Sequence, residues 1–269
     1  MKMPDDYIAK NRDAWNKRTT QHVGSEFYNM KSFVSGESSL QEIELKLLGN
    51  IEGKSILHLQ CHFGQDSLSM ARMGAAVTGA DLSDEAIRKA IEINEQLDLK
   101  AKFICCDIYD LPQYLDQTFD IVFTSYGTIG WLPDLSRWAA LIERYLKPGG
   151  KFIFAEFHPV VWMFDYDFDK VAYNYFKDEP IIEQTTGTYT DRNAPIEYEE
   201  VSWNHSLGEV FGSLLEHGME IIHFEEFDYS PYDVFKHTYE FAPGKFRISH
   251  LDNKIPMVYT LVATKKQQP

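Results

Sequence analysis

The sequence has few cysteines and no long apolar run, and each shortage excludes a class of protein. Its three cysteines, Cys61, Cys105 and Cys106, are an odd number with two of them adjacent, which is no disulfide framework of a small secreted domain. No apolar run approaches the roughly 20 residues of a membrane span. The N-terminal residues also lack the apolar segment of a signal peptide. We therefore expect a protein of the reducing cytoplasm that has no membrane partner.

The sequence also contains few basic residues relative to its acidic ones. Acidic residues outnumber them by 41 to 26, which gives a formal net charge of −15. A surface of this sign repels phosphate backbones, so we expect no nucleic-acid partner, whereas neutral or cationic small molecules are tolerated. The same charge is also typical of proteins that carry it for solubility alone. The oligomeric state stays open.

The 269 residues, 44% of them hydrophobic, suffice for a single α/β domain with insertions. We predict an N-terminal helical cap over residues 1–50, a cofactor-binding core over 51–157, an aromatic insertion over 158–204, and a further helix with two strands over 205–269. In the core, apolar strands at 56–59, 76–80, 102–107, 119–125 and 151–157 alternate with helices. This alternation is typical of right-handed βαβ units in a doubly wound, mostly parallel sheet of about seven strands.

Local signals mark several ends of these elements. Ser83 and Asp134 suit the N-cap positions of two core helices, and the segment KPGG (147–150) is expected to stop the second of them. The insertion is longer than ordinary α/β connections and predicts two strands around the turn DRNAP (191–195). No convincing helix separates the last two predicted strands, 219–228 and 256–266, so we expect the last strand to be antiparallel.

Two glycines are missing from the turn after the first predicted strand. A dinucleotide site has Gly-x-Gly-x-x-Gly there, whereas this chain has Gln60, Cys61, His62, Phe63 and Gly64. His62 would place a side chain where a pyrophosphate lies. S-adenosylmethionine has no phosphate and needs only an open turn with one small residue, which Gly64 supplies. The turn is therefore interpreted as intact for that cofactor.

Asp81 ends the second predicted strand, 17 residues after Gly64. An acid at this place suits a ribose, because its carboxylate can accept hydrogen bonds from both hydroxyls. A solvated or helix-capping aspartate is the alternative. Asp81 alone does not separate NAD from other adenosine cofactors.

Together these segments resemble the class I S-adenosylmethionine-dependent methyltransferases. The resemblance covers residues 55–159 closely and 206–265 more loosely, and it rests on four segments: ILHLQCHFGQDSLSMA, VTGADLS, FICCDIYDLP and FDIVFTSYGTIGWLPDLSRWAALIERYLKPGGKFIFAEFHP. This chain departs from the family in having Gln60 and His62 for glycines and His58 for an acidic residue. The departures leave open which groups bind the methionine end of the cofactor.

The resemblance implies a role for each matching residue. Gln60, Cys61, His62 and Gly64 would form the cofactor turn, Asp81 would hold the ribose, Leu82 would flank the adenine, Asp107 would accept from the adenine amino group, Ile108 would pack on the ring, and Ser125, Tyr126 and Gly127 would line the methyl-donor pocket. The N-terminal helices and the insertion would form the lid and the substrate walls. Tyr126 and Trp131 are placed to attract the sulfonium cation with their rings.

Two further groups of residues have competing interpretations. His58, Cys61, His62, Cys105 and Cys106 lie on neighbouring strands, but their spacing matches no zinc pattern, so we expect no metal. His158, at the tip of the fifth strand, is a candidate general base, or it merely turns the chain before Pro159. Tyr126 is the next catalytic candidate.

The function that these patterns favour is methyl transfer from S-adenosylmethionine to a small molecule. An NAD(P)-dependent oxidoreductase is the alternative that Gln60 and His62 disfavour. A protein that binds the cofactor without catalysis is a second alternative, since no base is obvious.

Overall fold

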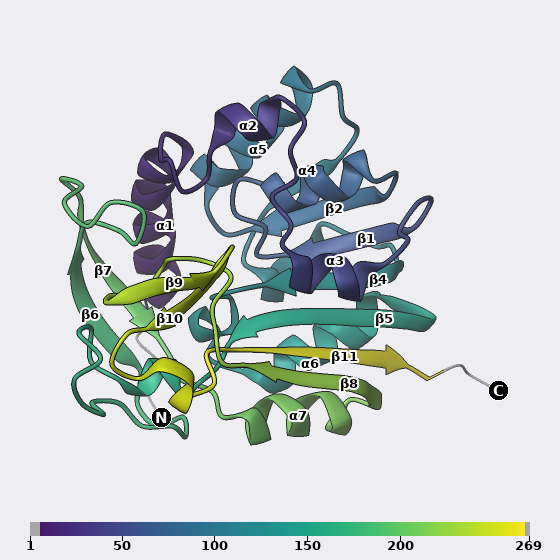
Figure 1. Ribbon diagram of the computed structural model, residues 1–269. Coiled ribbons are helices and arrows are strands. Elements are labelled where there is room, and N and C mark those ends of the chain that lie inside the picture. The colour runs from purple at the N-terminus through teal and green to yellow at the C-terminus, as the bar shows by residue number, and fades with distance from the viewer. Residues whose placement is uncertain (1–5, 267–269) are drawn as a thin grey trace.

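The computed structural model describes residues 6–266, and its centre is a seven-stranded sheet (Figure 1). The strand order is β3-β2-β1-β4-β5-β11-β8. The bounds are Ser55–Leu59 for β1, Ala76–Asp81 for β2, Lys102–Cys105 for β3, Phe119–Ser125 for β4, Leu146–Phe157 for β5, Met219–Phe227 for β8 and Val258–Lys265 for β11. Strands β1 to β5 pair in parallel, whereas β11 runs antiparallel to both β5 and β8. The predicted doubly wound sheet with an antiparallel last strand is confirmed.

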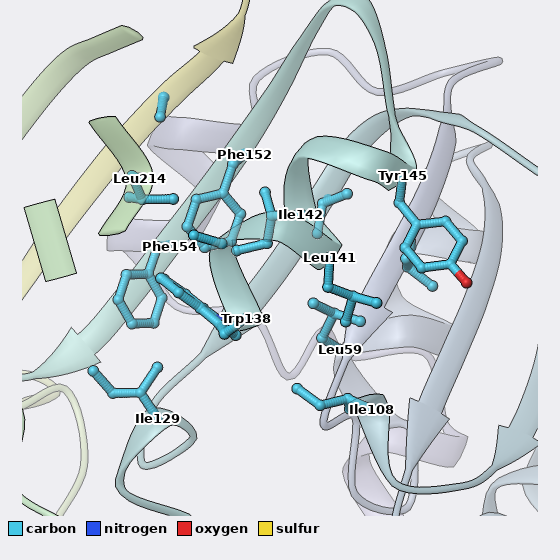
Figure 2. Packing of buried hydrophobic residues seen from close by; sticks show 14 of the residues in the cluster. Leu59, Ile108, Ile129, Trp138, Leu141, Ile142, Tyr145, Phe152, Phe154 and Leu214 are labelled. Atoms are coloured by element: carbon cyan, nitrogen blue, oxygen red, sulfur yellow. The ribbon is translucent and has the colours of Figure 1, made fainter. Parts of the chain in front are cut away.

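Helices cover both faces of the sheet because side chains alternate along each strand. Ile56 packs toward α2 (Met30–Val34), α3 (Glu42–Leu48), α4 (Gln65–Arg72) and α5 (Asp84–Gln96). Its neighbour Leu57 packs on the other side, with α6 (Leu135–Tyr145) and α7 (Leu207–Glu216). Figure 2 shows this second cluster, in which the fully buried Trp138 of α6 lies against Phe152 and Phe154 of β5.

The predicted helix starts are present, and the second helix stops before KPGG as predicted, but β5 begins at Leu146, earlier than the predicted strand 151–157. Ser83 Oγ accepts from the amide of Ala86 at 3.0 Å, and Asp134 Oδ1 accepts from the amide of Arg137 at 3.0 Å. Helix α6 ends at Tyr145, and the segment KPGG belongs to the beginning of β5 rather than to a loop. The chain passes directly from helix to extended backbone at Leu146. The pairing of β5 with β4 shifts register between Phe119 and Ile121, which accommodates the extra residues.

The insertion forms the predicted hairpin, with β6 spanning Ile181–Thr186 and β7 spanning Glu197–Ser202 in antiparallel pairing. Helix α1 (Tyr7–Val23) packs on β7. The side chain of Asn11 donates to the carbonyl of Val201 at 2.8 Å and accepts from its amide at 2.9 Å, so it pairs with the backbone of β7 much as a neighbouring strand would.

A second hairpin, β9 (Thr238–Ala242) with β10 (Lys245–Ile248), was not predicted. Its sequence signal is the Pro243–Gly244 pair between two short segments, and Gly244 has a φ of 67°. Figure 1 shows both hairpins and α1 gathered at the end of the sheet where β5 ends. Among residues 6–266, no helix has both the length and the apolar character required to cross a membrane.

Candidate functional site

The carboxyl ends of β1, β2, β4 and β5 open into a cavity of about 1020 Å³. All residues that the sequence assigned to cofactor binding line this cavity: Gln60, Cys61, His62, Gly64, Asp81, Leu82, Asp107, Ile108, Ser125, Tyr126, Gly127 and Trp131. Their convergence follows from the topology, because the carboxyl ends of parallel strands meet at one edge of a sheet.

The turn after β1 keeps a backbone shape that usually requires glycine. Gln60 has a φ of 55° and His62 a φ of 51°, both in the left-handed region. Non-glycine residues adopt this conformation at a cost of roughly 1–2 kcal/mol each. The turn therefore keeps the backbone conformation of a glycine-rich turn although two of its positions carry side chains. Gly64, with a φ of 79°, cannot be replaced in this way, because a Cβ there would lie 2.8 Å from the ring of Phe103.

The side chain of Gln60 connects this turn to the loop after β4. Its Nε2 donates to the carbonyl of Thr128 at 2.8 Å. Its buried Oε1 has no hydrogen-bond partner among the residues that the structure describes. An unpaired buried acceptor is costly, and a ligand in the cavity that Gln60 lines could pair it.

His62 is the residue of the cofactor turn that contacts the lid. Its Nε2 is 2.9 Å from Nδ1 of His22, and its buried Nδ1 lacks a partner within residues 6–266. Burial, with a smaller contribution from Arg18, lowers the pKa of His62 to about 3. The imidazole is therefore neutral at physiological pH.

Asp81 is buried at the end of β2. Its Oδ2 accepts from the amide of His62 at 2.8 Å and its Oδ1 from the amide of Ser83 at 2.9 Å. These bonds orient the carboxylate and leave lone pairs for two hydroxyl donors. Burial raises its pKa to about 6, although the backbone bonds oppose the shift.

The residues that follow β3 place a polar side chain, Asp107, next to an apolar one, Ile108. Ile108 is buried at the start of the short helix η1 (Ile108–Gln113), which Asp107 caps by accepting from the amide of Tyr109 at 3.0 Å. Leu82 lines the same part of the cavity. An apolar surface beside a carboxylate acceptor suits an adenine, whose ring can pack on the apolar side chains while its amino group donates to the carboxylate.

Glu156, at the end of β5, organises the loop after β4, a role that no local sequence pattern indicates. Its buried carboxylate accepts from the amides of Gly127, Thr128 (2.7 Å), Ile129 (3.2 Å) and Phe157 (2.7 Å), and from the Thr128 hydroxyl at 2.9 Å. Converging backbone amides of this kind are usually found around anions. The loop that carries Tyr126 and Gly127 is thereby held in one conformation.

For the lid, the sequence predicts the elements, namely the N-terminal helices and the insertion, but not the individual contacts that they make. On α1, Trp15 lies edge-on to His62 and Trp131, with ring centroids 5.2 and 5.5 Å away. Arg18, buried and paired with Glu200, has its guanidinium 5.2 Å from the centre of the Trp131 ring. The sequence signal for these contacts is a row of polar residues at 11, 18 and 22, which share one face of the helix.

Two short contacts join the N-terminal segment to the tip of the β6–β7 hairpin. His22 Nε2 lies 2.6 Å from the hydroxyl of Thr188, and the hydroxyls of Tyr28 and Tyr189 are 2.5 Å apart. His22 also contacts His62, so the hairpin tip is linked through one imidazole to the cofactor turn. We call these four residues, His22, Tyr28, Thr188 and Tyr189, the lid latch.

His158 lies elsewhere. The cavity lining, as far as residues 6–266 define it, does not include this side chain. Its Nδ1 accepts from the amide of Val160 at 3.2 Å, and its Nε2 is 3.0 Å from Glu226 Oε1 on β8. Both ring nitrogens thus face groups outside the cavity, and the geometry matches the alternative in which His158 fixes the chain before Pro159.

The histidines and cysteines considered as metal ligands point to separate partners. His58 Nδ1 is 2.8 Å from the Ser67 hydroxyl, and burial lowers the pKa of His58 to about 3. In the part of the chain that the structure describes, no three His, Cys, Asp or Glu side chains are arranged to hold a metal ion.

Comparisons with known proteins agree with this geometry. Residues 56–150 match the family model of a methyltransferase domain. An uncharacterized methyltransferase of Synechocystis sp. is 33% identical over 133 residues, which cover 49% of this chain and 60% of that protein. The chain spans about half the length of the curated relatives that it matches. These matches to methyltransferases give the oxidoreductase interpretation no support.

Two solved structures share the fold. The S-adenosylmethionine-dependent methyltransferase of Mesorhizobium loti has a TM-score of 0.57 and 22% identity, covering 86% of this chain and 99% of that one. The [4+2]-cyclase SpnF has a TM-score of 0.62 and 16% identity, with all of both chains covered. At such identities the likeness concerns the fold alone.

Proposed function

We propose that this chain, whose residues 56–150 match the family model of a methyltransferase domain, is a class I S-adenosylmethionine-dependent methyltransferase that transfers the methyl group of its cofactor to a small-molecule acceptor. The observation that carries the proposal is the turn after β1. Its left-handed backbone at Gln60 and His62 leads to the buried carboxylate of Asp81, which still has lone pairs to offer a ribose.

Each part of the cofactor has a matching group in the cavity. Asp81 would hold the ribose hydroxyls, and Asp107 with Ile108 would take the adenine. The unpaired Oε1 of Gln60 and Nδ1 of His62 would face the methionine portion, where a neutral imidazole does not repel the positive charges of the cofactor. When bound, the cofactor supplies an electrophilic methyl group on a sulfonium.

The contribution of this chain to the reaction would be alignment and the exclusion of water. Methyl transfer is an in-line displacement, for which a fixed geometry in a closed site accounts for much of the rate. Glu156 would fix the loop that carries Tyr126, and the lid latch would close the cofactor turn. His158 is not proposed as a base, because its ring nitrogens face Glu226 and Val160.

The cavity has room for both reactants. Small-molecule sites are typically roughly 300–1,000 Å³, and this one, at about 1020 Å³, is at the upper end. Its walls are rich in aromatic side chains from the insertion and from the segment before β9. Because the net charge is −15, we infer that the acceptor is neutral or cationic and that the protein has no nucleic-acid partner. We also infer a cytoplasmic location. We propose that the chain is one domain, in which residues 6–50 and 158–204 form the lid; residues 1–5 and 267–269 of the predicted domain lie outside the described residues.

The proposal is tested by methyl-transfer turnover. Protein and S-adenosylmethionine with a radioactive methyl group are incubated with a fractionated pool of small metabolites, and label in any fraction is identified by mass spectrometry. We expect label in a small molecule with the wild type and much less with Asp81→Asn. Saturable binding of S-adenosylhomocysteine without transfer to any fraction would favour a protein that binds the cofactor without methyl transfer.

A further inference from the structure

Asn204 lies in the short link between β7 and α7, at a wall of the cavity that is assigned to no part of the cofactor. The residue is buried, with 4% of its surface exposed. Its Nδ2 donates to the carbonyl of Pro159 at 3.1 Å and to that of Asn174 at 3.0 Å. These two carbonyls fix the orientation of the carboxamide, because exchanging its oxygen and nitrogen would set oxygen against oxygen. The atom that remains for a ligand is Oδ1.

This Oδ1 of Asn204 has no hydrogen-bond partner among residues 6–266. A buried acceptor without a partner costs free energy, and a ligand in the cavity that Asn204 lines could pair it. The unpaired atoms of Gln60 and His62 belong to the cofactor turn, and the hydroxyl of Tyr126 interacts with Glu44. Asn204 therefore marks a separate place in the cavity for a group that donates a hydrogen bond.

The segment that carries Asn204 is attached to the loop after β4 on both sides of this residue. The amide of Trp203 donates to the carbonyl of Gly130 at 2.8 Å, and Nε2 of His205 lies 2.8 Å from the carbonyl of Leu132. The beginning of the same loop is proposed above to line the methyl-donor pocket. A group bound at Oδ1 would therefore be held beside that loop, on the acceptor side of the cavity and in a fixed geometry.

The surroundings of this oxygen favour a neutral donor over an ammonium group. An amide oxygen has no formal charge, and the carboxylate of Glu209 is already 3.0 Å from Lys177 and 3.0 Å from His205. Trp203 and Pro159 add apolar surface to the cavity lining. An ammonium placed here would lack a counter-charge, which is costly in a buried site. A hydroxyl or N–H group needs only the acceptor that Oδ1 provides.

We propose that Asn204 selects the methyl acceptor: its Oδ1 accepts a hydrogen bond from a neutral donor of that molecule, a hydroxyl or an N–H group. This inference rests on the proposed function and narrows its substrate class to neutral molecules that carry such a donor. A molecule that places an apolar group or a second acceptor at this position leaves Oδ1 unpaired. The site rejects such a molecule more strongly than a difference in size alone would do.

The test uses three aromatic probes: phenol, fluorobenzene, in which fluorine replaces the hydroxyl at nearly the same size, and benzylamine, which is a cation at pH 7. Binding of S-adenosylhomocysteine is first measured alone by calorimetry. Each probe is then titrated into the protein with and without saturating S-adenosylhomocysteine. The variants are Asn204→Leu, which keeps the size of the side chain, and the matched control Gln184→Leu, which removes an exposed carboxamide on the same cavity.

With S-adenosylhomocysteine bound, we expect phenol to bind the wild type and Gln184→Leu about tenfold more tightly than fluorobenzene or benzylamine, because only phenol pairs the buried oxygen. Asn204→Leu should bind phenol and fluorobenzene alike. Since this substitution also removes both Nδ2 bonds, the wild type is followed by NMR as well. Its Asn204 carboxamide carbon resonance should shift on addition of phenol and stay in place on addition of fluorobenzene, a result that does not depend on the folding of the variant.

Several results would overturn the inference. One is equal binding of phenol and fluorobenzene to the wild type, or no saturable binding of phenol up to about 10 mM. A folded Asn204→Leu variant that keeps the preference would assign it to another group, and tighter binding of benzylamine would show an anionic site instead. A phenol preference that S-adenosylhomocysteine abolishes would assign Oδ1 to the cofactor. If S-adenosylhomocysteine fails to bind at all, the proposed function fails, and the role of Asn204 in binding a donor is judged from the titrations without it.

Discussion

Asp81 couples cofactor binding to pH. Burial raises its pKa to about 6, and ribose hydroxyls donate to the ionised form. As the pH falls through 6, the carboxyl becomes protonated and loses acceptor capacity, so the affinity for S-adenosylhomocysteine should fall between pH 7 and pH 5. Calorimetry over this range should show the fall in the wild type. Asp81→Asn should bind more weakly by on the order of 1–3 kcal/mol and show a flatter profile.

His62 is the control for this prediction. Its pKa of about 3 keeps it neutral throughout the range, so His62→Gln should retain the pH dependence near 6. A flat profile in His62→Gln with an unchanged profile in Asp81→Asn would assign the titration to the imidazole instead.

Glu44 should make the protein less stable as the pH rises. Its pKa is raised from 4.5 to about 8 by burial, so the folded state holds a proton that the unfolded state releases. The stability contributed by that proton is complete below pH 4.5 and is lost as the pH rises toward 8, with a total on the order of a few kcal/mol. Urea unfolding of Glu44→Gln should give a free energy of unfolding that depends less on pH between 5 and 8. Parallel pH profiles for the wild type and the variant would contradict this.

Glu156 should be needed for the loop after β4. Glu156→Gln keeps the size of the side chain but replaces one acceptor oxygen with an NH2 group facing backbone amides. We expect a loss of unfolding free energy on the order of 2–3 kcal/mol and weaker S-adenosylhomocysteine binding, measured by urea unfolding and calorimetry. The exposed Glu179→Gln is the matched control and should change neither quantity. A Glu156→Gln variant with normal binding would show that the loop does not depend on this carboxylate.

Single residues differ in how far the sequence predicts them. Asp81 and Asp107 could be placed because a strand end and a helix start surround each of them. The left-handed backbone at Gln60 and His62 could not be inferred from their residue types, since both usually avoid it. The bonds of Glu156 depend on the loop from another strand, which no local pattern reveals.

The lid latch acts at the scale of whole elements, since it joins α1 and the segment after it to the tip of the β6–β7 hairpin. Thr188→Val removes the hydrogen bond to His22, and Tyr189→Phe removes the bond to Tyr28 together with a long contact of 3.5 Å to His22. Loss of one such bond costs about 1 kcal/mol, so the rate at which S-adenosylhomocysteine dissociates should rise about fivefold, as measured by stopped-flow displacement. The free energy of unfolding should fall by no more than about the same 1 kcal/mol.

The matched control is Tyr173→Phe, which removes a hydroxyl bond to Glu183 elsewhere in the insertion. It should leave the dissociation rate unchanged. Equal acceleration in the control and in the latch variants would mean that the insertion loosens as a whole and that the latch has no specific role.

Elements were predictable where the pattern is local. The alternating apolar strands and the caps at Ser83 and Asp134 give most of the core. The strand after α6 was predicted to begin at residue 151, after KPGG, whereas β5 begins at Leu146, because a register shift in the β4–β5 pair takes this segment into the strand. The β9–β10 hairpin was missed because both strands are short and β9 is mostly exposed, so a clear apolar alternation is lacking.

At the scale of the whole molecule, the fold follows from sequence order, but the closure of the site does not. Asn11 pairs with Val201, and His22 contacts Thr188, across more than 160 residues of sequence. Such contacts depend on where the insertion packs. Their only local signal in the sequence is the row of polar residues on one face of α1.

We propose that the turn after β1, with Gln60 and His62 in place of glycines, binds S-adenosylmethionine. Calorimetric titration of S-adenosylhomocysteine, compared with NADH under the same conditions, tests it most directly. We expect saturable binding of one S-adenosylhomocysteine per chain, weakened in Asp81→Asn, and no binding of NADH. Binding of NADH without binding of S-adenosylhomocysteine by the folded protein would contradict it.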